Sequence, residues 1–236
     1  MRRLLYILTL LLTSYNLFGQ TAVIIPKEFV ETVPPNAESD ERNSLNYSQN
    51  EYGVHIVDGK LEIKKVVEVN KCELNISNGK LIGINRGEWG GTLSFVPTDT
   101  TKSKVEIKRG NIKFIFTFED KIYFIEGLAH LSLSSGALYE LDNTNGGFTY
   151  KKLIDFDDTP VGFSIYQDKF LIATHERFYV VKDFKKELIF QDTYWSGLYP
   201  NSIAVLDDKN VFIGMRGGIG KLDLSTKTFK FYKNDK

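Results

Sequence analysis

The sequence lacks most of the residue patterns that reveal a function directly. It contains one cysteine, Cys72, which excludes an internal disulfide, and no cysteine near Gln20 that would mark a lipoprotein. Its three histidines are scattered and show no metal-ligand spacing, so we expect neither a metal nor a cofactor. No G-x-S-x-G elbow is present, and the glycine-rich run 214–220 leads into a strand rather than the helix of a dinucleotide site.

An excess of charge is also missing. Lys and Arg total 30 and Asp and Glu total 30, which argues against a nucleic-acid partner, because such binding needs clustered positive charge. The one distinctive apolar run, Leu4 to Leu12, follows Arg2 and Arg3 and has the layout of a signal peptide. We therefore predict a removed signal over residues 1–20 and a periplasmic or extracellular protein with no membrane insertion afterwards. An uncleaved anchor is the alternative.

What the sequence does contain is a repeated unit of short strands. The stretch 200–233 reads as four strands closed by Asp, Gly, Asn or Ser, which is a meander. Its first tight turn has counterparts upstream, and the equivalent positions Lys80, Lys121, Lys169 and Asn210 are 41, 48 and 41 residues apart. Four strands in each period of about 40 to 50 residues are typical of a β-propeller.

The strand that follows each of these turns is apolar without strict alternation, which predicts that both of its faces are buried. This is expected where each blade lies between two neighbours. The four copies read KLIGINR, KIYFIEG, KFLIATH and NVFIGMR.

We predict an all-β protein, a single β-propeller over residues 21–236 built from four-stranded antiparallel blades. Five blades are favoured, at about 21–69, 70–110, 111–157, 158–197 and 198–236. In the first, residues 22–25 and 29–33 would be the inner pair. Four blades with a disordered leader over 21–50 and an added hairpin over 51–69 are the alternative, and a β-sandwich or solenoid is a more distant one. Because the last unit is complete, we expect closure by face packing without shared hydrogen bonds.

Candidate site residues follow from the meander. One end of the blades carries tight turns and the other carries longer, richer loops, and binding residues belong on such loops. Aromatic rings would stack on a ligand and Arg would grip its oxygens. The competing interpretation is that the two tryptophans only plug loops into the core. The predicted ligand-binding residues are Arg86, Trp89, His130, His175, Trp195 and Arg216.

Acidic residues at the same end are weaker candidates for a functional site. Asp155, Asp157 and Asp158 are interpreted as turn caps rather than a calcium site. The carboxylates Glu88, Glu126, Asp157 and Glu176 are candidates for paired catalytic acids, although nothing in their spacing selects them. Ser134 has no carboxylate partner that the sequence can place.

The repeat KNVFIGMRGGIGKLDLSTKTFKFYK, with NSIAVLDD before it, resembles the blades of bacterial extracytoplasmic propellers of the NHL, YVTN and two-component-regulator type over residues 70–236. The resemblance implies binding rather than chemistry and transfers no catalytic residue. We expect an exported module that binds a polar small molecule, a glycan or a protein through its loop-rich face. The alternative is a propeller enzyme, a hydrolase, lyase or cyclotransferase, acting on a sugar or peptide.

Overall fold

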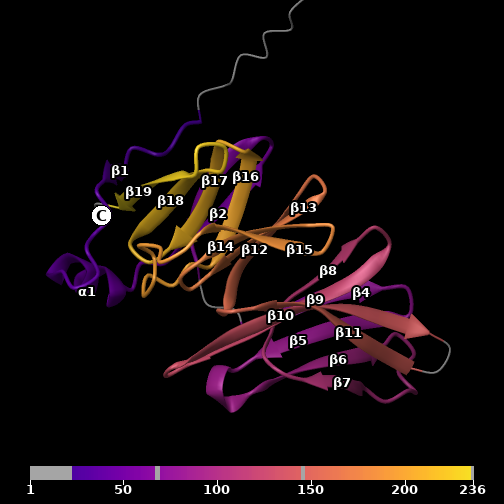
Figure 1. Cartoon of the computed structure of the whole chain (residues 1–236). Helices are drawn as coiled ribbons and strands as arrows, with labels where there is room; N and C mark the ends of the chain where they lie inside the picture. Colours follow the sequence, from indigo (N-terminus) through magenta and orange to yellow (C-terminus); the bar gives the residue numbers. More distant parts are fainter. Residues whose placement is uncertain (1–22, 67–69, 145–146, 235–236) are drawn as a thin grey trace, which may run out of the picture.

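The computed structural model describes residues 23–66, 70–144 and 147–234 (Figure 1). The predicted signal peptide lies outside these residues. The described chain is all-β apart from the seven-residue helix α1 (Asp40–Asn46) and the short 3₁₀ helix η1 (Gly87–Trp89). Neither helix is long and apolar enough to cross a membrane.

Four antiparallel meanders of four strands follow one another along the chain; the first three each form a four-stranded sheet, and the fourth forms a five-stranded sheet together with β1 (Phe29–Thr32). The first consists of β4 (Lys71–Ile76), β5 (Gly79–Asn85), β6 (Gly91–Pro97) and β7 (Val105–Arg109). The second consists of β8 (Ile112–Phe118), β9 (Lys121–His130), β10 (Leu133–Thr144) and β11 (Gly147–Phe156). The third consists of β12 (Pro160–Tyr166), β13 (Lys169–Thr174), β14 (Phe178–Lys182) and β15 (Lys185–Phe190). The fourth is β16 (Ser202–Asp207), β17 (Asn210–Met215), β18 (Gly218–Asp223) and β19 (Thr228–Asn234). The predicted class and the four-stranded repeat are confirmed.

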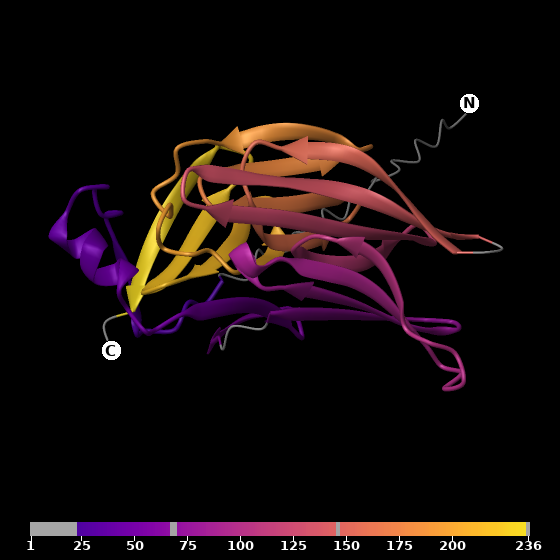
Figure 2. The same cartoon turned by 90° about the horizontal axis from the view of Figure 1, so that it is seen from below.

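A separate hairpin, β2 (Tyr52–Val57) and β3 (Lys60–Lys65), forms a two-stranded sheet. Its turn residues Asp58 and Gly59 both have positive φ, at 49° and 70°, as a two-residue type I′ turn requires. β2 packs on β16 and β17, so the hairpin covers the far face of the fourth meander. Figures 1 and 2 show the sheets stacked in chain order, from the magenta β4–β7 sheet to the yellow β16–β19 sheet.

Separate apolar clusters fill the successive sheet interfaces. Between the second and third meanders, for example, Tyr123 and Ile125 of β9 pack with Phe170 and Ile172 of β13. The next residues along β13, Leu171 and Ala173, point the other way into the cluster shared with the fourth meander. The second strands β9, β13 and β17 are therefore buried on both faces, as their sequence predicts, and the sheets pack as propeller blades do. In β5, Leu81 is buried but its neighbours Ile82 and Ile84 are only partly buried, so its prediction holds for one face.

The prediction for residues 21–69 is wrong in its strand pairing. Residues 22–25 and 29–33 do not form an inner pair, because β1 (Phe29–Thr32) joins the outer edge of the last sheet and pairs antiparallel with β19. The two termini therefore share hydrogen bonds, and the expected closure by face packing alone is also wrong. Nor are residues 23–50 a disordered leader, since they include β1 and α1.

Candidate functional site

Antiparallel meanders place alternate connections at opposite ends of a sheet. We name the end that carries residues 86–90, 131–132, 157–159, 175–177, 191–201 and 216–217 the loop end, and the opposite end the turn end. Contacts across neighbouring sheets, described below, join these connections into one face of the molecule. All six predicted site residues belong to connections or strand ends at the loop end: Arg86, Trp89, His130, His175, Trp195 and Arg216.

Three of these residues gather where the first two meanders meet. His130 Nδ1 lies 3.2 Å from Glu88 Oε2, which joins the β9–β10 turn to η1. The backbone N–H of Arg86 donates to Asn111 Oδ1 at 3.1 Å, and the Arg86 side chain is exposed. Trp89, next to Glu88, is 82% exposed, so the interpretation of Trp89 as a plug is wrong.

Two leucines extend this corner. Leu131, which follows His130, is 93% exposed, and Leu133 is 68% exposed. Together with Trp89 they form what we call the apolar corner, three large apolar side chains presented to solvent at the loop end. Sequence reasoning missed the leucines, although a Leu-Ser-Leu run at a hairpin turn, where polar residues are usual, was a visible indication.

Trp195 plays a different part from the one predicted. It is fully buried in the cluster between the third and fourth meanders, and its indole N–H donates to the carbonyl of Thr174 at 3.1 Å. Its position contradicts a direct ligand contact and agrees with the alternative in which a tryptophan anchors its loop.

His175 and Arg216 both contact the ring of Tyr199. The guanidinium carbon of Arg216 is 3.7 Å from the centre of this ring, and the His175 ring stands edge-on to it at 6.2 Å. Burial lowers the pKa of His175, although the carboxylate of Asp158 acts in the opposite direction. Through Tyr199, a residue after β13 of the third sheet and a residue after β17 of the fourth are thus brought together.

Arg216 makes two hydrogen bonds within the molecule. Its Nε donates to Glu51 Oε1 at 2.6 Å, and a terminal nitrogen donates to the carbonyl of Asn46 at 2.8 Å. The second bond satisfies a carbonyl at the C-terminus of α1, where a cation is favourable. Arg216 therefore fastens the N-terminal segment to the last sheet.

Asp158 is a buried hydrogen-bond acceptor between the second and third meanders. Its carboxylate accepts from the Ser134 hydroxyl, from the Thr159 N–H at 2.8 Å and from the Glu176 N–H at 2.7 Å. Burial alone would raise the pKa of Asp158, but these bonds and one from the Thr174 side chain lower it overall. The structure thus supplies the partner for Ser134 that the sequence did not reveal, and Asp158 acts as a cap.

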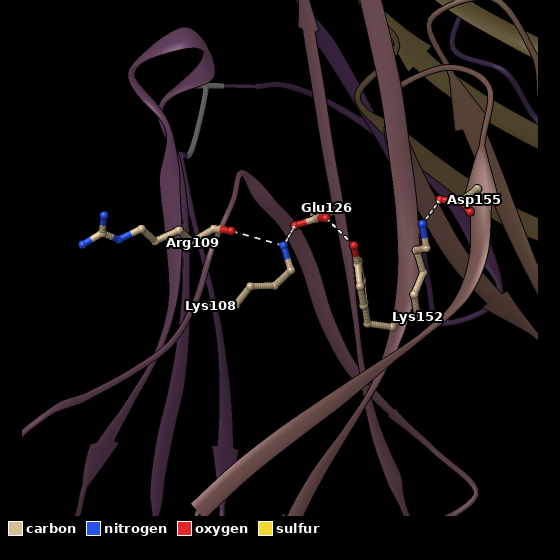
Figure 3. A network of polar contacts seen from close by, with 6 residues as sticks. Lys108, Arg109, Glu126, Lys152 and Asp155 are labelled. Atoms are coloured by element: carbon tan, nitrogen blue, oxygen red, sulfur yellow. Dashed lines mark hydrogen bonds and ion pairs between the residues drawn. The ribbon is translucent and has the colours of Figure 1, made fainter.

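The other carboxylates also have their own partners. Asp157 pairs with Lys186 at 2.9 Å, and Asp155 pairs with Lys152 at 2.7 Å. Glu126 of β9 accepts from Lys108 of β7 at 2.5 Å and from the Tyr139 hydroxyl at 2.6 Å (Figure 3). Glu126 and Asp157 are thus each paired with a lysine, and Glu88 lies against His130. Within residues 23–66, 70–144 and 147–234, no three His, Cys, Asp or Glu side chains gather to hold a metal ion.

No family model matches the chain. No curated protein matches it either. Among solved structures, the crystal structure of the tricorn protease aligns with a TM-score of 0.41 and 11% identity over 78% of this chain and 26% of that one. A crystal structure of the computationally designed Ika8 protein aligns with a TM-score of 0.36 and 11% identity over 76% of this chain and 73% of that one. The chain thus spans about a quarter of the tricorn protease chain.

The predicted residues therefore fall into three sets. Arg86, Trp89 and His130 lie at the junction of the first two sheets, His175 and Arg216 meet through Tyr199, and Trp195 lies in the core. Of these sets, the first offers exposed side chains, those of Arg86 and Trp89, beside the Glu88–His130 pair.

Proposed function

We propose that the protein is an exported binding module that recognises a protein partner through the apolar corner at its loop end. The observation that supports this is the exposure of Trp89, Leu131 and Leu133 on the two connections that the Glu88–His130 pair joins. Exposed apolar groups surrounded by polar ones are typical of protein interaction sites, and Trp and Arg dominate the binding energy of such sites.

Recognition of a small polar ligand is the weaker candidate. Its best donor would be Arg216, but Glu51, Asn46 and the Tyr199 ring already occupy that guanidinium. An enzymatic role is likewise not favoured by a particular observation, because Glu126 and Asp157 each pair with a lysine and Glu88 lies against His130. The apolar corner does not depend on unoccupied hydrogen-bond donors or unpaired carboxylates, because its binding energy comes from burying its own apolar surface.

Site-specific photo-crosslinking in the producing cell tests the proposal. A benzoylphenylalanine at position 89 should capture a discrete partner, whereas the same group at position 47 should not. Tyr47 is a matched control, because it is also aromatic and 79% exposed but lies beyond α1.

The captured protein is then purified and its affinity measured. We expect Trp89→Ala to weaken binding by roughly 30-fold or more, the loss of about 2 kcal/mol that defines a hot spot. Tyr47→Ala should bind as the wild type does. Equal affinity of the wild type and Trp89→Ala would refute the proposal.

A further inference from the structure

The hairpin β2–β3 occupies the place of a fifth blade but has only two strands. β2 packs against β16, the first strand of the last meander, as β16 itself packs against β12. Each of the other four sheets continues for two more strands, whereas β3 pairs only with β2 among the residues that the structure describes. The outer edge of β3 is therefore where a third strand would be added.

The backbone of β3 is oriented for such an addition. The two-residue turn makes Val57 and Lys60 a hydrogen-bonded pair, so bonded and non-bonded pairs alternate from there. By this alternation the N–H groups of Lys60, Glu62 and Lys64 face β2. Those of Leu61, Ile63 and Lys65 face the outer edge.

A hollow lies beside this edge. Its volume is about 390 Å³, and it is lined by Ile63 and Lys65 of β3, by Tyr52 of β2, and by Glu28, Phe29, Asn50 and Asn234. The rings of Phe29 and Tyr52 meet edge-on at 5.0 Å within it. The hollow thus runs from β3 to the outer strands β1 and β19 of the last sheet.

Complete sheets show what normally fills this position. Tyr179 of β14, a third strand, packs on Phe156 of β11, the fourth strand of the preceding sheet, with ring centres 5.6 Å apart. A third strand beside β3 would in the same way pack on β19 and β1, where the hollow is. Val23 and Ile25 contact the same apolar cluster but belong to no strand.

The charges of β3 indicate which kind of strand could pair with its outer edge. Lys60, Lys64 and Lys65 outnumber the single carboxylate Glu62, so the strand carries two positive charges in excess. Lys64 pairs with Glu62, which leaves Lys60 and Lys65, the latter donating to the neutral Asn50 side chain at 2.8 Å. Lysines on an edge strand oppose pairing with an identical edge, so a second copy of this chain is disfavoured. An acidic strand would instead meet complementary charge.

We infer that β3 accepts an extended, acidic segment of another protein, which adds to the hairpin as a third strand and places apolar side chains in the hollow. Main-chain hydrogen bonds to residues 61, 63 and 65 provide the affinity, and the lysines and the hollow provide the selectivity.

The test uses the full chain and two designed octapeptides, one alternating valine with glutamate and one alternating valine with lysine. Binding is followed by fluorescence anisotropy, and the amides of residues 61, 63 and 65 by hydrogen exchange. We expect the glutamate peptide alone to bind and to slow exchange at these three amides.

Two variants at one position separate backbone from side chain. Lys65→Pro removes an outward N–H but no bond to β2, and should weaken binding at least tenfold. Lys65→Ala keeps the N–H and should bind more tightly than Lys65→Pro, with thermal melts verifying that both variants are folded. Absence of peptide binding, equal binding of both peptides, or protection that grows with protein concentration alone would overturn the inference, the last result indicating self-pairing.

Discussion

At the scale of single residues, the clearest prediction concerns Asp158. Asp158→Asn replaces a carboxylate that accepts from Ser134, Thr159 and Glu176 with an amide whose nitrogen cannot accept. We expect the free energy of unfolding at pH 7 to fall by about 1–3 kcal/mol, the cost of leaving buried donors unpaired. Chemical denaturation measures this change.

The effect of Asp158→Asn on the unfolding free energy should also depend on pH. Because the pKa of Asp158 is lowered in the folded state, the stability it provides is present above the unfolded pKa of about 3.9 and is lost as pH falls through the folded value. The difference between wild type and Asp158→Asn should therefore shrink below pH ~4. Asp157→Asn is the control, since its pair with Lys186 is exposed, and it should change stability by less than about 1 kcal/mol. Equal midpoints for all three proteins at pH 7 would contradict the assignment of Asp158 as a cap.

Single residues also show where sequence reasoning succeeds. The alternation of connections in a meander follows from the strand count, so it correctly placed Arg86, His175 and Arg216 at one end. It did not reveal that Arg216 meets Glu51, 165 residues away, or that Trp195 reaches the carbonyl of Thr174. Such partners depend on the three-dimensional packing of distant segments, which has no local pattern.

At the scale of elements, Lys108 and Glu126 connect two sheets through a largely buried ion pair. Their side chains are 14% and 18% exposed (Figure 3). Lys108 also lies over the ring of Tyr139 at 5.1 Å. Lys108→Met leaves the Glu126 carboxylate without its cation, so we expect a loss of about 2–4 kcal/mol in unfolding free energy.

A double-mutant cycle separates the free energy that the ion pair contributes from the cost of desolvating its two charges. Lys108→Met with Glu126→Leu should recover most of the lost stability, because two apolar side chains replace both charges. The exposed pair Lys182–Asp168 is the matched control and should contribute less than about 1 kcal/mol. A double variant no more stable than Lys108→Met would show that the pair itself, rather than the unpaired charge, accounts for the loss.

Elements differ in how far the sequence reveals them. The second strands, such as β13, were predictable because burial on both faces leaves an uninterrupted apolar run. β1 was misassigned because four residues carry no period, and its partner β19 lies about 200 residues further along the chain. Its sequence fits an inner or an outer strand equally well, and only the three-dimensional structure, in which β1 pairs with β19 and Phe29 packs on Tyr52, shows that it is an outer one.

For the whole molecule, the question is how the N-terminal segment holds the stack of sheets together. β1 covers the edge of β19, and Phe29 fills the cluster between the last sheet and the hairpin. Deleting residues 1–33 removes both contributions and exposes the edge of β19. Burial of one Phe side chain stabilises by about 1.5–3 kcal/mol, and an uncovered edge strand is open to pairing with other chains.

We therefore expect the protein without residues 1–33 to lose about 2–4 kcal/mol of unfolding free energy. It should also form oligomers at concentrations where the parent is monodisperse. Denaturant titration measures the first effect and light scattering the second. The control is deletion of residues 1–22, which keeps every described residue and should behave as the parent does. If both truncated proteins unfold at the same midpoint, the strand pairing adds nothing measurable, and face packing of the sheets is enough to hold the fold, as the sequence alone had suggested.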